Sequence, residues 1–340
     1  MKPPFDALLL VSFGGPEGRE DVIPFLENVL RGRNVPQQRM LEVAEHYYRF
    51  SGVSPLNEQN RALIDALRQE FETAGVDLPI FWGNRNWRPY LADALAEMAS
   101  RKIERALALV TSAYSSYSGC RQYLENIEAA RESVGPAAPV VEKLRAFFNH
   151  PGYLEAQAEV LASSLEQLPA GQRESAEVLF TAHSIPQVMA ASCQYAAQLH
   201  EACRLTAAVC NLRRWRLVYQ SRSGPPQQPW LAPDVCDALR ELAAGGEARS
   251  VVISPIGFLS DHIEVLYDLD IEARAVCDEL KLSMVRTPTV GTHPRFVRML
   301  RELVEERLNP FLPRQALGEL GPSPDACPVD CCRFERRPPG

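Results

Sequence analysis

The sequence contains no hydrophobic run long enough to cross a bilayer as a helix, which takes about 20 apolar residues. Its first residues, MKPP, also lack the apolar core and cleavage site of a signal peptide. Basic residues are outnumbered by acidic ones, 36 to 43, and the resulting net charge of -7 argues against a nucleic-acid partner. We therefore expect a cytoplasmic protein, monomer or homodimer, with no transmembrane segment and at most peripheral membrane contact.

A dinucleotide-binding fingerprint is absent as well. The apolar run at 5–13 ends in Gly14-Gly15-Pro16, which lacks the third glycine of that motif and contains a proline instead. The run predicts a buried strand followed by a tight turn into a helix.

What is present is typical of a globular α/β protein. The 340 residues are 46% hydrophobic and 23% charged, which suits two domains of ordinary size. Apolar runs alternate with amphipathic segments, and this alternation predicts doubly wound parallel sheets. The expected strands are 5–13, 78–83, 106–112, 139–143, 177–182, 216–220, 250–253 and 282–285. Because the pattern restarts near Pro151, we predict two similar Rossmann-like domains, 1–150 and 151–310, with a cleft between them and a tail at 311–340.

Three carboxylates recur every fourth residue after the strand at 250–253. Glu264, Asp268 and Glu272 would share one face of a helix, while Val265 and Leu269 would lie on an apolar face. A solvated acidic face is one interpretation. The other is a ladder that conducts protons or a divalent cation, because open α/β sheets bind ligands beyond the carboxyl ends of their strands.

A histidine follows the strand at 177–182. His183 could be structural, or its imidazole could accept a proton or bind a borderline metal. It and the segment with Glu264 both begin where strands of one domain end, so both can face one crevice. One imidazole and one carboxylate with open positions suit ferrous iron better than a closed zinc site.

Other strand-end loops supply rings and cations. Singly, each would be a core-edge ring or a solvated charge. Together they suit a large flat π-system with carboxylate arms, because rings stack on it and arginines pair with carboxylates. These residues include Phe13, Arg31, Arg33, Tyr47, Arg85, Trp87, Tyr114, Tyr117 and Tyr123.

The tail has a different composition. Pro and Gly residues exclude regular structure there, and we expect this tail to be mobile. Its stretch of six residues at 327–332 contains three cysteines, Cys327, Cys331 and Cys332. They could be chance thiols, or part of a metal or iron–sulfur site that needs a fourth thiolate. Cys120, in the loop after the strand at 106–112, is the best-placed fourth donor, and zinc is the alternative occupant.

The motifs resemble those of the ferrochelatases, which insert ferrous iron into a porphyrin. The resemblance covers about residues 5–308 and rests on LLLVSFGGPE at 8–17, GVSPLN at 52–57, FTAHSIP at 180–186, YQSRSGPPQQPWLAPDV at 219–235 and PIGFLSDHIEVLYDLDIE at 255–272. FWGNRNW at 81–87 and TSAYSSYSGCRQY at 111–123 are similar to the actinobacterial-type branch.

The resemblance implies roles for particular residues. His183 and Glu264 match the family's metallation pair, and Ser54 and Tyr123 match porphyrin-contacting positions. It also implies a [2Fe-2S] cluster on the tail cysteines, and coproporphyrin III rather than protoporphyrin IX as substrate. The cationic stretch with Arg33, Arg39, His46 and Arg49 favours the same substrate, since coproporphyrin has four propionates and protoporphyrin two. A non-catalytic porphyrin carrier would need neither Glu264 nor the carboxylate ladder.

Overall fold

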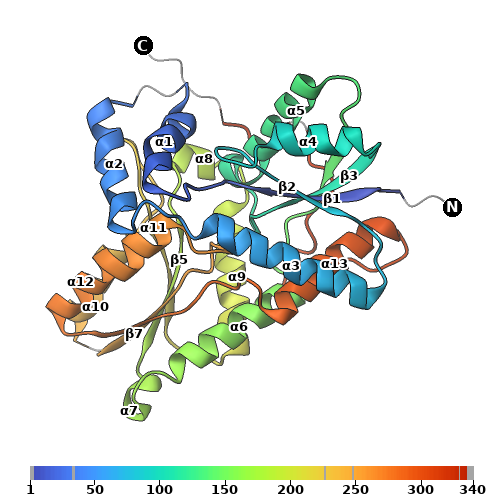
Figure 1. The fold of residues 1–340 in the computed structure, drawn as a ribbon. Coiled ribbons are helices and arrows are strands. Elements are labelled where there is room, and N and C mark those ends of the chain that lie inside the picture. Colours follow the sequence, from blue (N-terminus) through green and yellow to red (C-terminus); the bar gives the residue numbers. More distant parts are fainter. Residues whose placement is uncertain (1–3, 33–34, 226, 247–248, 329, 335–340) are drawn as a thin grey trace.

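Two parallel sheets of four strands form the protein in the computed structural model, which describes residues 4–32, 35–225, 227–246, 249–328 and 330–334 (Figure 1). The first sheet has the order β2-β1-β3-β4, from strands β1 Ala7–Ser12, β2 Ile80–Asn84, β3 Arg105–Val110 and β4 Val140–Lys143. The second sheet has the order β6-β5-β7-β8, from β5 Glu177–His183, β6 Trp215–Gln220, β7 Ser250–Ser254 and β8 Ser283–Arg286. The same strand order occurs twice, so the prediction of two similar doubly wound α/β halves is confirmed.

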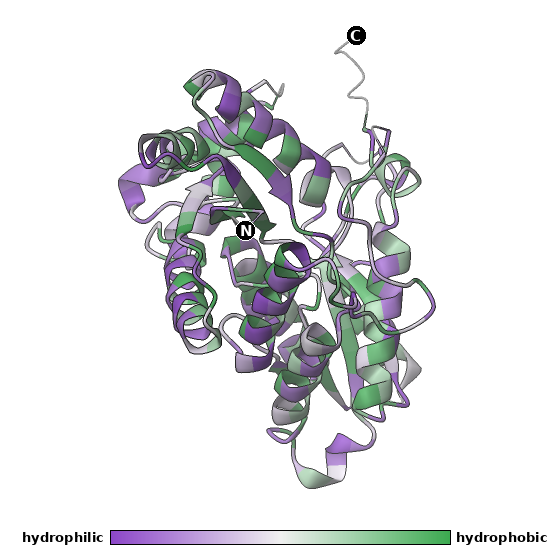
Figure 2. Cartoon of the chain, turned by 90° about the vertical axis from the view of Figure 1, so that its right-hand side faces the viewer, coloured by the Kyte–Doolittle hydropathy of each residue, from purple (hydrophilic) through white to green (hydrophobic). Residues whose placement is uncertain are grey.

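Helices cover the two sheets. In the first half they are α1 Val22–Leu30, α2 Gln37–Arg49, α3 Leu56–Ala74, α4 Leu91–Ser100 and α5 Gln122–Val134. In the second half they are α6 Pro151–Leu165, α7 Ala170–Arg173, α8 Gln187–Ala190, α9 Tyr195–Val209, α10 Val235–Gly245, α11 Ile263–Val265, α12 Arg274–Leu280 and α13 Pro294–Leu308. Hydrophobic residues gather on the strands and on the helix faces turned toward them (Figure 2). Among the described residues, no helix has the length and apolar character needed to span a bilayer.

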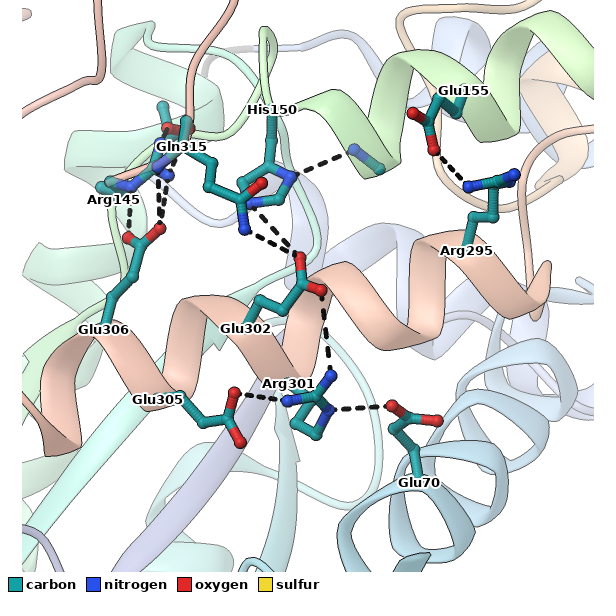
Figure 3. Close-up of polar contacts among 12 residues, drawn as sticks. Glu70, Arg145, His150, Glu155, Arg295, Arg301, Glu302, Glu305, Glu306 and Gln315 are labelled. Atoms are coloured by element: carbon teal, nitrogen blue, oxygen red, sulfur yellow. Dashed lines mark hydrogen bonds and ion pairs between the residues drawn. The ribbon is translucent and has the colours of Figure 1, made fainter. Parts of the chain in front are cut away.

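One hydrophobic core extends across both halves. It includes Leu8 and Leu10 of β1 together with Val178 and Phe180 of β5, all buried. Helix α13 packs against α6 of the second half and α3 of the first, where Arg301 Nε donates to Glu70 Oε1 at 2.8 Å (Figure 3). The two halves therefore share packed side chains, whereas the division at residues 150 and 310 stays a prediction.

The carboxylate segment differs from the expected α-helix. After the single turn α11, a π-helix runs over Leu266–Ala273, and α12 completes the segment. In a π-helix the hydrogen bonds close after five residues, and such turns are rare and frequent at functional sites. The apolar face appears as expected, because Val265, Leu269 and Ala273 are fully buried.

The tail has no helix or strand within its described residues, as its prolines and glycines predicted, but it is held against the body and does not hang free. Arg145 Nη2 donates to the carbonyl of Gln315 at 2.8 Å, and Asn149 Nδ2 donates to the carbonyls of Leu317 and Gly321 at 3.0 and 2.9 Å. Arg145 also holds Glu306 of α13 (Figure 3). These contacts correct the expectation of a mobile tail and bring its cysteines back to the first half.

Candidate active site

An imidazole and a carboxylate meet where β5 and β7 end. His183 is the last residue of β5, and its Nε2 lies 3.7 Å from Oε2 of Glu264, the second residue of α11. The Nδ1 of His183 lies 2.5 Å from the carbonyl oxygen of Ser184, so this contact orients the ring. The Glu264 side chain is 52% exposed and His183 35%, which leaves both accessible to a ligand. The two residues are 81 positions apart in the chain, and the strand order of the second sheet brings them together.

A second histidine, His262, also lies beside Glu264. Its Nδ1 is 3.9 Å from Glu264 Oε2, and its ring packs edge-on against Phe258. Burial lowers the pKa of His262, and the Glu264 carboxylate opposes this shift. The sequence reasoning left His262 out of the predicted site, although its place two residues before Glu264 was a usable signal. The neighbouring Asp261 forms an ion pair with Arg286, in which Arg286 Nη1 donates to Asp261 Oδ1 at 3.1 Å.

Asp268 lies one turn beyond Glu264 on the π-helix. Gln220 Nε2 donates to its Oδ2 at 3.2 Å, and the Ser221 hydroxyl donates to the same oxygen. Burial raises the pKa of Asp268 to about 7, and the Glu264 and Glu272 carboxylates add to this rise while the Ser221 hydrogen bond opposes it. Partial burial also raises the pKa of Glu272, although its side chain still reaches solvent. Asp268 therefore interacts electrostatically with both Glu264 and Glu272. The Asp268 carboxyl can gain or lose a proton near neutral pH.

Four of the predicted residues of the first half, Phe13, Tyr47, Arg85 and Tyr123, form one cluster with Phe25, which we call the aromatic wall. Trp87 also packs edge-on against Phe25, whereas Tyr114 is buried in the main core and Tyr117 packs against Phe334. Phe13 and Tyr47 both pack against Phe25 of α1, with ring centroids 6.2 and 5.8 Å apart. The Arg85 guanidinium lies 4.6 Å from the centroid of Tyr123 and 5.6 Å from that of Phe13. Burial raises the pKa of Tyr47, and the Glu264 carboxylate adds to it, so this wall stands within electrostatic reach of the metallation pair.

The remaining predicted porphyrin contacts are Arg31 and Ser54. Arg31 is exposed and its Nη2 donates to Asn28 Oδ1 at 2.5 Å. Ser54 is buried just before α3, against Gly15. Arg33 lies outside the described residues.

Helix α2 also contacts the π-helix of the second half. The ring of His46 stacks on that of Tyr267, with centroids 3.6 Å apart and planes inclined by 7°. Arg49 lies over the same tyrosine at 5.6 Å. Burial lowers the pKa of His46, and Arg39 and Arg49 lower it further. The sequence reasoning did not predict this contact between the halves.

The four cysteines named from the sequence lie near one another: Cys327 interacts with both Cys120 and Cys331, and Cys332 with both Cys331 and Cys120. A hydrogen bond between the Cys120 and Cys327 thiols raises the pKa of the former and lowers that of the latter. The sulfurs of Cys331 and Cys332 lie 3.5 Å apart, and burial raises the pKa of Cys332. Arg121 Nη1 donates to the Cys331 carbonyl at 3.2 Å, which ties the tail to the loop that carries Cys120. Within the described residues, no three His, Cys, Asp or Glu side chains form a ready-made metal-binding group.

The fold is shared with solved chelatases. SirB from Bacillus subtilis, solved with Fe³⁺, is 10% identical with a TM-score of 0.56, over 89% of this chain and 96% of that one. SirB from Bacillus subtilis subspecies spizizenii in complex with cobalt gives a TM-score of 0.52 at 11% identity, over 89% of this chain and 95% of that one. At these identities the likeness establishes the fold.

The family follows from sequence comparison. The model of the family described as Ferrochelatase matches residues 5–308, so the chain belongs to the ferrochelatase family and is a metal chelatase. It is similar to a ferrochelatase of Rhodopirellula baltica, at 58% identity over 99% of this chain and 96% of that protein. It is also similar to the coproporphyrin III ferrochelatase of Streptomyces coelicolor, at 51% identity over 97% of this chain and 93% of that protein. The resemblance found in the sequence motifs is confirmed.

Proposed function

We propose that this enzyme inserts ferrous iron into coproporphyrin III in haem biosynthesis, with His183 and Glu264 as the residues that act at the metal. Membership of the ferrochelatase family supports the reaction, and the 3.7 Å contact between His183 Nε2 and Glu264 Oε2 is the observation that supports these two residues. We further propose that the protein acts in the cytoplasm.

The reaction requires proton transfer. A free-base porphyrin must lose two pyrrole protons as the Fe²⁺ ion enters, so the product carries the iron and two protons leave. The Nε2 of His183 can accept a proton or hold the ion. Glu264 can then perform the other of these two tasks. Asp268 is suited to receive a proton from Glu264, because its pKa of about 7 lets it titrate at the working pH. Glu272 would pass the proton to water, since its side chain is exposed.

Two variants test the metallation pair. His183→Ala and Glu264→Gln should each lower kcat by about 100-fold or more, as expected of groups that act in proton transfer, while fluorescence titration still detects porphyrin binding. Glu279→Gln is the matched control, because Glu279 is an exposed carboxylate on α12 away from the pair. Turnover by both variants near that of the wild type would disprove the assignment.

The choice of porphyrin rests on the relatives and on charge. Several similar proteins are named coproporphyrin III ferrochelatase, including those of Streptomyces coelicolor and Nocardia farcinica at 51% and 49% identity. Four propionates need more cationic partners than two. Helix α2 carries exposed Arg39 and Arg49, and Arg49 lies over Tyr267 of the second half. Steady-state kinetics with both porphyrins, at matched detergent and salt, should give the higher kcat/KM for coproporphyrin III, and a higher value for protoporphyrin IX would overturn the choice.

We also propose that Cys120, Cys327, Cys331 and Cys332 hold a [2Fe-2S] cluster. Such a cluster takes four thiolates, two on each iron. The four thiols supply this number of donors and lie near one another, since Cys327 interacts with both Cys120 and Cys331 and Cys332 lies 3.5 Å from Cys331. The cluster would tie the tail to the first half.

The cluster has a direct test. Anaerobically purified protein should be reddish-brown, contain iron and acid-labile sulfide, and lose its visible bands on reduction, whereas Cys120→Ser should lose the colour. Cys210→Ala is the control, because Cys210 is half-buried in the second half, where its thiol donates to the Ala158 carbonyl. Colourless reconstituted protein would refute the proposal, and stoichiometric zinc would identify a zinc site instead.

A further inference from the structure

Three buried tyrosines from three different elements meet where β5 and β7 end. Tyr114 follows β3, Tyr153 lies in α6 and Tyr195 begins α9, and they are 2%, 0% and 7% exposed. The Tyr114 ring packs edge-on against both of the others, with centroids 6.4 Å from Tyr153 and 6.2 Å from Tyr195. We call these three residues the tyrosine triad.

The hydroxyls of the triad point at two backbone carbonyls. Tyr195 donates to the carbonyl of His183 at 3.0 Å. Tyr153 and Tyr114 both donate to the carbonyl of Ile256, at 2.7 and 3.0 Å. A phenol with an ordinary pKa near 10 keeps its proton at neutral pH and can donate in this way.

These carbonyls belong to the two segments that carry the metallation pair. His183 ends β5, and Ile256 lies two residues after the end of β7, in the loop that leads to Glu264. The loop is pinned to β5 as well, because the amide of Gly257 donates to the Thr181 carbonyl at 3.0 Å. The triad therefore attaches both segments to one rigid group of rings.

The triad also connects to the first half of the protein. Gln198, one turn after Tyr195 in α9, accepts from the Ser115 amide at 2.7 Å and donates to the Ser115 hydroxyl at 3.1 Å. Ser115 directly follows Tyr114, so the loop after β3 is held by α9 on one side and by the Ile256 carbonyl on the other.

We propose that Tyr114, Tyr153 and Tyr195 are positioning residues that set the separation of His183 and Glu264 through hydrogen bonds to the His183 and Ile256 carbonyls. This inference rests on the proposed role of that pair. A shift of about 1 Å in a reacting group can lower a rate by about 100-fold. The triad does not touch the porphyrin in this scheme, so its loss should affect the chemical step and leave porphyrin binding unchanged.

The test removes single hydroxyls and keeps the rings. Tyr195→Phe and Tyr153→Phe should each lower kcat about 10- to 100-fold with the KM for coproporphyrin III within twofold of the wild type. Tyr114→Phe should have a smaller effect, because the shorter bond from Tyr153 still holds the Ile256 carbonyl. Tyr48→Phe is the control, since the described residues show no hydrogen bond to the Tyr48 hydroxyl.

The outcomes separate the inference from the proposed function. Wild-type protein without chelatase activity would refute the proposed function itself. Active wild-type protein, together with folded Phe variants that keep kcat within twofold or that raise only KM, would refute the positioning role alone. If one of Tyr195→Phe and Tyr153→Phe fails to fold, as judged by its melting transition, the other decides by the same split between kcat and KM.

Discussion

Asp268 should make the protein less stable as the pH rises, and Asp268→Asn should remove this effect. Burial raises its pKa from the usual 3.8 to about 7. Between these two values the folded state holds a proton on Asp268 that the unfolded state has released. Because the unfolded state then binds fewer protons, the free energy of unfolding falls as the pH rises from about 4 to about 7.

The size of the effect follows from the difference between the two pKa values. A pKa difference of about three corresponds to about 4 kcal/mol at and above pH 7. Asp268 is only half-buried, so solvent reduces the cost and we expect about 2 kcal/mol. Asparagine has nearly the same shape, and its Oδ1 can accept the same hydrogen bonds from Gln220 and Ser221.

Urea unfolding at two pH values tests this reasoning. Asp268→Asn should raise the free energy of unfolding by about 2 kcal/mol at pH 8 and by clearly less at pH 5, with the dependence on urea unchanged. A gain that is the same at both pH values, or a loss at pH 8, would show that the carboxyl is not held protonated by burial. The variant should also turn over more slowly, because asparagine cannot relay a proton.

Two further predictions concern packing. Arg145→Met should lower the free energy of unfolding by about 3–5 kcal/mol, because it leaves the buried carboxylate of Glu306 unpaired (Figure 3). Arg295→Met breaks only the exposed pairs with Glu155 and Glu159 and should cost much less, and chemical denaturation of both variants compares them. Gly257→Ala should lower the free energy of unfolding by about 1–3 kcal/mol, because the new Cβ would lie 2.5 Å from the Cβ of Ala182. A melting temperature equal to that of the wild type would contradict the close packing of β5 against the loop after β7.

Much of the candidate site's geometry was predictable because each of its residues lies just after a recognisable strand. His183 and Glu264 follow strands of one parallel sheet, and neighbouring parallel strands end at the same edge. The carboxylate spacing likewise placed three acidic side chains in succession. The π-helical form was not predicted, because the apolar positions 265, 269 and 273 are compatible with an α-helix as well, and only the hydrogen bonds distinguish the two.

The sequence by itself determined the alternation of strands and helices, the family and the residues at the strand ends, because these depend on nearest neighbours and on motif spacing. Only the tertiary structure decided which distant side chains meet. His46 stacks on Tyr267, Tyr195 reaches the His183 carbonyl, and the Cys120 thiol meets that of Cys327. Such contacts depend on how the two halves and the tail pack together, and that packing is set by the sum of many weak apolar contacts that no single stretch of sequence contains.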